Sequence, residues 1–353
     1  MQETKKNILV NVLNWGLGHA VRSSVIIRRL KEDGHRVYIA SDGIALRFLQ
    51  KEFPELPSYE LPAYGIDYKR SSILLNVLVK TPKILGAIIK EKHITNQLCK
   101  SLDIDLLISD NRLACYNNKV ESIYISHQLE LPIQNRILAF FANGVHRLFI
   151  RQYHHCCIPD LIGHLKLAGR LSQASSIKKV TYLGILSELK TNSIEKDIPV
   201  LAVLSGPEPQ RSHLEQLLIQ ESKALRIQLT IIRGTDRKQA TNSHEYLSSY
   251  DLLDRKEIQH LMDRSEIVIS RSGYTSLMDI YAQPTKVFFI PTPGQWEQEY
   301  LAKHWAENFE TNFSAQKSFS LKAAVEQASY PDFSKTKQKQ NDLSYLQTRL
   351  SEI

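Results

Sequence analysis

Apolar strand patterns and amphipathic helix patterns alternate along this chain, and this alternation constrains its fold more than any other feature. Residues 8–13 form an apolar strand pattern, a helical pattern follows at 20–31 and ends at Gly34, and a second strand pattern lies at 36–41. This order is typical of a βαβ unit with parallel strands. Further strand patterns lie at 106–109, 122–125 and 156–158. The first half is therefore expected to form a doubly wound parallel sheet, with ligands at the carboxyl ends of its strands.

A second alternating series begins near residue 199. Strands are expected at 200–204, 228–232, 266–270 and 286–290, and helices at 212–224, 255–262 and 275–282. A length of 353 residues suits two α/β domains of roughly 150 to 180 residues each. We expect Rossmann-like domains at 1–186 and 199–335, a polar linker at 187–198, and a C-terminal helix within 336–353.

The most specific candidate site lies where the strand at 266–270 meets the helix at 275–282. The turn between them consists of Ser270, Arg271, Ser272 and Gly273. The first amides of a helix lack intrahelical partners and carry the positive end of its dipole, so this turn can hold a diphosphate. Asp279 follows Thr275 by one helical turn on the same face, where a carboxylate suits a pair of ribose hydroxyls. The pattern predicts a nucleotide site, and an ordinary strand–turn–helix with a buried Arg271 is the alternative.

Together with residues 284–302, this motif resembles the donor-binding half of the GT-B glycosyltransferases. The resemblance is closest to family 28, which includes N-acetylglucosaminyltransferases that act on a lipid-linked muramyl-pentapeptide. In that family the Ser-Arg-small-Gly turn meets the diphosphate, an acidic residue at the Asp279 position binds ribose, and a pair matching Glu297 and Gln298 reads the donor sugar. Asp279 stands where glutamate is usual, and Glu297 and Leu301 replace commoner residues. These departures leave the identity of the donor sugar open.

The loop between the first strand and the first helix carries two glycines and a histidine. Gly16 and Gly18 let the backbone pass close to a ligand, and they bring His19 to the start of the helix. A dinucleotide fingerprint would need a third glycine where Val21 stands, so a nicotinamide enzyme is disfavoured. In the resembling family this loop lies near acceptor and diphosphate, and its final histidine is a candidate base.

Polar residues also follow other predicted strands. His127 comes after the strand at 122–125 and is a second candidate for contact with substrate. Asp110 follows 106–109, and it could orient a histidine, contact the acceptor or cap a helix. The loop at Ser205 and Gly206 matches the place where the family sets a small-residue loop against the diphosphate, and Arg211 could reach back to a phosphate. A plain proline-rich turn is the alternative there.

Charge and cysteine content narrow the classes of partner. The formal net charge is +8 and the pI is near 9.1, which favours anionic partners. Because the basic residues are not confined to one tail, nucleic acid is not the preferred partner. The four cysteines form no C-x-x-C pair and have no histidines at zinc spacing, so we expect free thiols and no metal. The apolar run at 8–13 is too short for an export signal, and no apolar window is long enough to span a membrane.

Residues 68–100 allow two interpretations. Seven basic residues lie in this segment against the single acid Glu91, and apolar residues recur near helical spacing until Pro82 interrupts them. The segment could be a helix pair that packs on its own domain with its lysines in water. It could also be an interfacial patch that brings the acceptor side of the enzyme to an anionic membrane surface, as the resemblance implies.

Taken together, the residues and the resemblance predict a cytoplasmic, inverting, metal-independent glycosyltransferase without a cofactor, with two domains facing each other across a cleft. The donor is expected to be a UDP-sugar, first of all UDP-N-acetylglucosamine, and the acceptor a lipid-linked or glycan hydroxyl. His19 would take the proton from that hydroxyl, and the enzyme could lie peripherally on the inner face of the membrane. In GT-B proteins the last helix crosses back to the first domain, and 341–350 could do so. A UDP-N-acetylglucosamine epimerase of the same fold and a non-catalytic nucleotide-sugar sensor are the alternatives.

Overall fold

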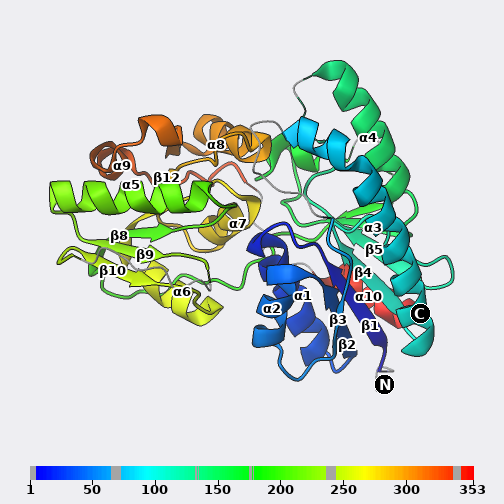
Figure 1. Cartoon of the computed structure of the whole chain (residues 1–353). Coiled ribbons are helices and arrows are strands. Elements are labelled where there is room, and N and C mark those ends of the chain that lie inside the picture. The colour runs from blue at the N-terminus through cyan, green and yellow to red at the C-terminus, as the bar shows by residue number, and fades with distance from the viewer. Residues whose placement is uncertain are drawn as a thin grey trace. The chain divides into compact units, whose positions relative to one another are not determined.

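The chain divides into two compact α/β units (Figure 1). A computed structural model describes residues 5–64, 73–131, 133, 135–174, 177, 179–235, 244–336 and 343–353, with the backbone alone for 73–82. Unit 1 comprises Met1–Leu186 and Lys337–Ile353, and unit 2 comprises Ser187–Thr336. Each unit contains its own parallel sheet with helices on both sides.

The sheet of unit 1 has the strand order β3-β2-β1-β4-β5-β6-β7 in the described residues, and every neighbouring pair is parallel. The strands are β1 (Asn7–Val12), β2 (Arg36–Ser41), β3 (Ser58–Glu60), β4 (Leu106–Asp110), β5 (Glu121–Ile125), β6 (His155–Ile158) and β7 (Val180–Tyr182). In the register of the central strands, Asp110 at the end of β4 lies opposite Val12 of β1 and Ile125 of β5. Residues that follow β1, β4 and β5 therefore gather at one edge of this sheet.

The helices of unit 1 begin and end where local signals place them. They are α1 (Leu17–Glu32), α2 (Gly43–Glu52), α3 (Ile73–Ser101), α4 (Arg136–Ile150), α10 (Ser344–Glu352) and the 3₁₀ turn η1 (Gly169–Ser172). Helix α1 starts after Gly16, whose φ of 86° suits glycine. The side chain of Asn135 caps α4 by accepting from the Leu138 amide at 3.0 Å. The expected helix pair at 68–100 is wrong within the described residues, because the backbone of α3 is helical through Pro82.

The sheet of unit 2 has the order β10-β9-β8-β11-β12-β13 in the described residues, and its pairs are again parallel. Its strands are β8 (Ile198–Val203), β9 (Leu229–Ile232), β10 (Leu247–Tyr250), β11 (Ser265–Ser270), β12 (Lys286–Phe289) and β13 (Asn312–Phe313). Its helices are α5 (Gln210–Leu225), α6 (Arg255–Asp263), α7 (Tyr274–Ala282), α8 (Trp296–Phe309), α9 (Leu321–Gln327) and the 3₁₀ turn η2 (Gln316–Ser318). Ser270 at the end of β11 lies opposite Val203 of β8 and Phe289 of β12, so the loops after these strands meet.

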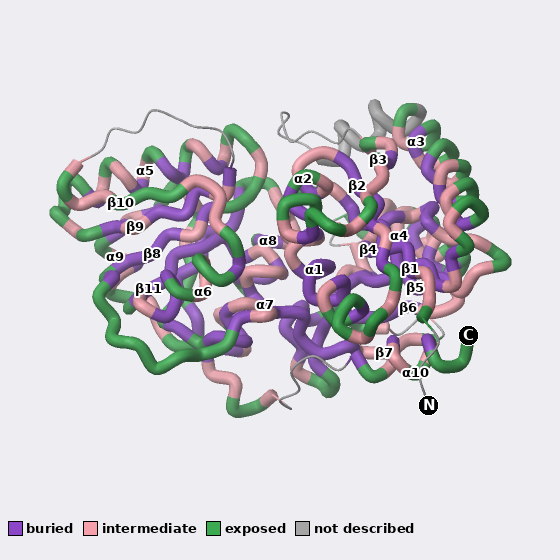
Figure 2. The backbone as a smooth tube through the Cα atoms, turned by 90° about the horizontal axis from the view of Figure 1, so that it is seen from below, coloured by how far each residue is buried: buried purple, intermediate pink, exposed green. Residues whose placement is uncertain are grey.

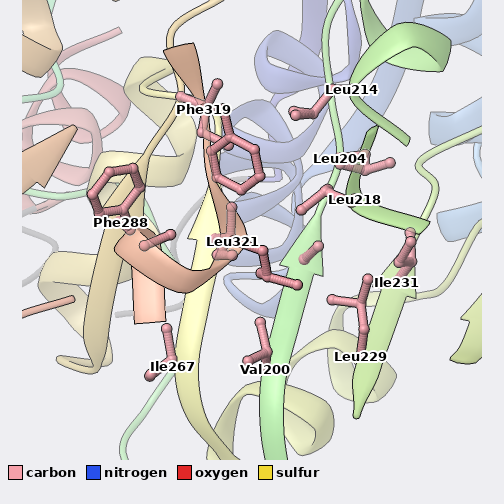
Figure 3. Close-up of a cluster of buried hydrophobic side chains, with 14 residues drawn as sticks. Val200, Leu204, Leu214, Leu218, Leu229, Ile231, Ile267, Phe288, Phe319 and Leu321 are labelled. Carbon is pink, nitrogen blue, oxygen red and sulfur yellow. The ribbon is translucent and has the colours of Figure 1, made fainter. Parts of the chain in front are cut away.

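The core of unit 2 follows the alternation of side chains along its strands. Alternate residues of β8, β11 and β12 face α5 and α9, and Leu214 and Leu218 of α5 pack against them (Figure 3). Helix α6 lies on the opposite face of the sheet from α5 (Figure 1). Figure 2 shows the central strands buried and the outer helices partly exposed. A sheet that is covered on both faces explains why its strands read as continuous apolar runs.

Two segments at the domain boundaries are held by polar contacts. Residues 187–198, where a linker was expected, cluster with unit 2, since the Asn192 amide and side chain both donate to Asp263, at 3.1 and 2.7 Å. Helix α10 clusters with unit 1. Its Arg349 donates to Glu121 at 2.7 Å, and its Tyr345 ring stacks on His155 with ring centroids 4.3 Å apart.

Candidate functional site

Unit 1 brings His19, Asp110 and His127 together at the carboxyl edge of its sheet. His19 lies in the first turn of α1, Asp110 ends β4, and His127 follows β5. His19 Nδ1 lies 2.8 Å from Asp110 Oδ1. Asp110 is completely buried, His127 is buried, and the His19 side chain is 12% exposed. Sequence reasoning named these residues separately, and the strand order makes them neighbours.

Arg22 is the centre of this cluster, and sequence reasoning missed it. Its guanidinium forms an ion pair with Asp110, to which its Nε also donates at 2.7 Å, and its Nη1 lies 2.8 Å from His127 Nδ1. Ser23 Oγ donates to the second Asp110 oxygen at 2.8 Å. The one signal in the sequence is spacing, because Arg22 follows His19 by three residues and so shares its helix face.

The partners of the two imidazoles determine what each ring can do. A guanidinium only donates, so Nδ1 of a neutral His127 accepts from Arg22, and its proton is then on Nε2. His19 Nδ1 lies between two groups, Asp110 Oδ1 at 2.8 Å and Arg22 Nη2 at 2.9 Å. If Nδ1 donates to the carboxylate, Nε2 of His19 carries a free lone pair. In that tautomer His19 Nε2 can accept a proton, whereas Nε2–H of a neutral His127 is only a hydrogen-bond donor.

Burial and neighbouring charges shift the pKa values of His19 and Asp110 so that the imidazole is neutral and the carboxylate is ionised. Burial lowers the pKa of His19, the Arg22 guanidinium lowers it further, and Asp110 only partly opposes them. For Asp110, burial alone would raise the pKa, but Arg22 and then His19 outweigh burial and hold the pKa well below its usual value. The carboxylate therefore stays ionised and the imidazole stays neutral near pH 7.

A second buried network fixes the glycine-rich loop that precedes His19. Asn14 Nδ2 donates to Asp42 at 3.0 Å, and Asp42 pairs with Arg112, which also donates to Glu91 at 3.2 Å. Position 43 must be glycine for this contact to form, since a Cβ there would lie 2.2 Å from the side-chain nitrogen Nδ2 of Asn14. The loop with Gly16 and Gly18 is thus anchored at its first residue.

In unit 2 the Ser270–Gly273 turn lies at the N-terminus of α7, as the strand–turn–helix pattern predicts. Arg271 is completely buried. It donates to the carbonyls of Ile290 at 3.1 Å, Pro291 at 3.3 Å and Gln210 at 2.9 Å, and to Gln316 Oε1 at 2.8 Å. These acceptors are all neutral, and burial lowers the pKa of the guanidinium to about 10. Within the described ranges no carboxylate pairs with Arg271.

Asp279 lies on α7 where the sequence places it, but it has strong partners. Arg255 donates to both of its oxygens, at 3.0 and 2.6 Å, and Ser187 Oγ donates at 2.6 Å. A carboxylate has about four acceptor sites, so such a group can still accept from a ligand. Thr275, one turn earlier, is half-buried on the same helix.

Gln298 connects the 270–273 turn to the loop after β12. Ser272 Oγ donates to the Gln298 carbonyl at 2.7 Å, and the Thr292 amide donates to Gln298 Oε1 at 2.8 Å. An added Cβ on Gly273 would lie 3.9 Å from Gln298 Nε2. Glu297, its expected companion, is half-buried in the first turn of α8.

The loop after β8 exposes Ser205 and Gly206, whereas Arg211 is buried. The Arg211 guanidinium donates to Glu208 at 2.7 Å and to Glu215 at 2.8 Å. Glu208 Oε2 also accepts from the Ser212 amide at 3.3 Å, in the first turn of α5. Arg211 is therefore held by carboxylates in this structure, and its expected contact with a phosphate stays a prediction.

Two features of the chain concern metals and membranes. Among residues whose positions are given, no three His, Cys, Asp or Glu side chains gather as metal ligands. No helix in the described part of the chain has both the length and the apolar character needed to cross a bilayer.

Comparisons with known proteins match both halves of the chain. Residues 203–349 match the glycosyltransferase family 28 C-terminal domain, and residues 6–135 match a model described as glycosyl transferase family 1. A relative from Clostridium tetani is 25% identical over 286 residues, covering 78% of this chain and 75% of that protein. Its name is UDP-N-acetylglucosamine–N-acetylmuramyl-(pentapeptide) pyrophosphoryl-undecaprenol N-acetylglucosamine transferase.

Solved structures share the fold. MurG from Acinetobacter baumannii superposes with a TM-score of 0.55 at 13% identity, covering 92% of this chain and 89% of that one. The glycosyltransferase SnogD from Streptomyces nogalater gives a TM-score of 0.61 at 10% identity, covering 99% and 95%. At such low identity the likeness shows the fold, and the predicted α/β class and GT-B fold are confirmed.

Proposed function

Because this chain is a family 28-like glycosyltransferase of the GT-B fold, we propose that it moves a sugar from a UDP-sugar to the hydroxyl of a lipid-linked or glycan acceptor. The reaction inverts the anomeric centre and needs neither a metal ion nor a cofactor. N-acetylglucosamine is our first choice of donor sugar, since the name of the Clostridium tetani relative includes UDP-N-acetylglucosamine. The observation that carries the proposal is the 2.8 Å contact between His19, in the first turn of α1, and the buried Asp110 at the end of β4.

His19 is the general base of the proposed reaction. Its Nε2 accepts the proton of the acceptor hydroxyl as the hydroxyl oxygen attacks the anomeric carbon, and the bond to the diphosphate breaks on the opposite side. Asp110 accepts from Nδ1–H, which selects the tautomer and stabilises the imidazolium that forms. His127, whose Nδ1 is held by Arg22, is the second histidine that contacts substrate.

The negative charge of the departing diphosphate falls on unit 2. The N-terminus of α7, with the positive end of the helix dipole, and the exposed Ser205–Gly206 loop are suited to bind it. The buried guanidinium of Arg271 adds a positive charge that no described carboxylate neutralises, and it acts through the backbone that it holds. Asp279 binds the ribose, with Arg255 and Ser187 fixing its position.

A thermal-shift screen of UDP, GDP, CMP and TDP sugars tests this function. Only UDP-sugars should stabilise the protein, by about 2.7 kcal/mol at a hundredfold the dissociation constant. UDP should also bind more tightly than its 2′-deoxy analogue if Asp279 contacts the ribose. EDTA should leave transfer unchanged. Stabilisation by a different nucleotide class would sink the donor assignment, and donor turnover without an acceptor would identify an epimerase instead.

An anionic membrane surface is the partner we propose for unit 1, and helix α4 is the contact. Of the segment 68–100, residues 68–72 and the side chains up to Pro82 lie outside the described residues. Beyond them, Leu85 and Ile89 of α3 are exposed. Helix α4 exposes more apolar surface, at Ile137, Phe140, Phe141, Val145 and Leu148, which are 55 to 73% exposed. It contains two arginines and no acidic residue, so anionic lipid suits this face better than a second copy of the same positive surface.

We expect the double substitution Phe140→Ser/Phe141→Ser to abolish sedimentation with phosphatidylglycerol vesicles at low salt, because these side chains provide the apolar contact. Binding of UDP should not change. The control is Leu225→Ser, which removes an apolar side chain that is 40% exposed in unit 2 and should leave sedimentation intact. Wild-type protein that stays in the supernatant at low salt would refute the membrane assignment.

A further inference from the structure

The hydroxyl of Thr292 is buried and has no hydrogen-bond partner among the described residues. Thr292 follows β12 in unit 2 and is 1% exposed, and less than 1 Å² of its Oγ1 is accessible to solvent. Buried hydroxyls in proteins are nearly always paired, because leaving one unpaired costs stability. An unpaired buried hydroxyl therefore needs an explanation, and one explanation is that it pairs with a bound ligand.

The position of this hydroxyl is fixed by residues of the expected donor site. Arg271 holds the carbonyls of Ile290 and Pro291, the two residues before Thr292, at 3.1 and 3.3 Å. The Thr292 amide donates to Gln298 Oε1 at 2.8 Å. Ser272 in turn holds the Gln298 carbonyl at 2.7 Å. The 270–273 turn thus reaches Thr292 by two routes.

Gly206 lies beside the hydroxyl and has no side chain to cover it. Its φ of +99° is one that side chains other than glycine rarely adopt. A Cβ built on Gly206 would lie 3.2 Å from Thr292 Oγ1, and within the described residues nothing else beyond its chain neighbours lies within 4 Å of that point. Gly206 itself is exposed. A side chain at position 206 would cover the hydroxyl, whereas a ligand oxygen that packs on the exposed Gly206 backbone can approach it to hydrogen-bonding distance.

We propose that the Thr292 hydroxyl donates a hydrogen bond to an oxygen of the donor's diphosphate, which lies over Gly206. The inference rests on the proposed function, because it places a nucleotide-sugar at this edge of unit 2. An anionic oxygen suits this place better than a neutral one, since the Arg271 charge lies one peptide away with no described carboxylate to balance it. Hydrogen bonds to charged oxygens are also the stronger kind.

The test is Thr292→Val, which keeps the shape of the side chain and removes the hydroxyl. We expect the dissociation constant for UDP, measured by calorimetry, to rise about tenfold or more. The melting temperature of the free protein should stay the same or rise, because no hydrogen bond is lost in that state. If the hydroxyl were merely structural, Thr292→Val would lower the melting temperature and leave the dissociation constant for UDP unchanged. Thr292→Ser, the control that retains the hydroxyl, should bind UDP within about threefold of wild type.

Two outcomes overturn the inference alone. If wild type binds UDP and Thr292→Val binds it equally well, the hydroxyl is not a ligand. If the variant loses affinity only for the UDP-sugar and not for UDP, the hydroxyl contacts the sugar rather than the diphosphate. Wild-type protein that binds no UDP would instead contradict the proposed donor, and this inference with it.

Discussion

Replacing His19 with alanine is expected to lower kcat by about 10²- to 10⁴-fold, while donor affinity stays within about threefold. The imidazole accepts a proton only as the new bond forms, so its loss acts on the chemical step. Initial rates at saturating acceptor, together with calorimetric titration of UDP, separate the two quantities. His19→Gln is a useful companion because it keeps a polar side chain but has no basic nitrogen.

The pH dependence of the reaction rate also tests the role of His19 as the base. Burial and Arg22 lower the pKa of His19 below its ordinary value of 6.5, and a base works only above its pKa. The wild-type rate should therefore stay level below pH 6.5 and decline only at a lower pH. This acidic limb should be absent in His19→Ala. His127→Ala should have the smaller effect on kcat, and the opposite ranking of the two variants would move the base to His127.

Asp110→Asn is expected to destabilise the protein by about 3–5 kcal/mol and to reduce kcat at least a hundredfold. The substitution leaves Arg22, which is 1% exposed, without its counter-charge. It also removes the acceptor that selects the His19 tautomer. Urea unfolding at pH 7 measures the first effect and initial rates measure the second.

The stability of the Asp110 pair has a predictable pH dependence. The pKa of Asp110 is lower in the folded protein than its unfolded value of about 3.9, so the carboxylate contributes fully above that value. Its contribution is lost as the pH falls toward the folded pKa. The stability gap between wild type and Asp110→Asn should be constant between pH 5 and 7 and should shrink below about pH 4.

A double variant separates stability from catalysis at Asp110. Combining Asp110→Asn with Arg22→Met removes both charges, so much of the lost stability should return while activity should not. Equal stability of Asp110→Asn and wild type at pH 7 would show that the buried pair does not hold this site. Recovery of activity in the double variant would show that Asp110 acts only on the fold.

Local patterns predicted most of the regular elements. Apolar runs located β1, β2, β4, β5, β8 and β11 to within two residues, because strands buried on both faces carry an unbroken apolar signal. The short strands β3, β7, β10 and β13 were not predicted, since each is largely exposed or only a few residues long. Helices α2, α4, α8 and α9 were also missed. Pro82 was expected to interrupt the segment 68–100, but the backbone of α3 is helical through it.

Local patterns likewise predicted some residues of the candidate site but not others. A polar residue after an apolar strand is a local signal, and it located His19, Asp110, His127 and the 270–273 turn. Arg22 and Thr292 could not be located so, because their importance depends on which strands are neighbours. Arg22 meets Asp110 and His127 only since β4 lies between β1 and β5, and Thr292 reaches Gly206 only since β8 and β12 both flank β11.

The sequence by itself determined the class of this protein, since strand and helix periods, the turn at 270–273 and the Gly-x-Gly-His loop are all short-range properties of the chain. Only the tertiary structure decided which side chains are partners. Arg271 illustrates the difference. Its place in the motif suggested direct contact with a phosphate, but folding surrounds it with carbonyls from β12 and α5 and leaves it fully buried. Burial and pairing depend on residues far apart in the chain, and no local pattern contains that information.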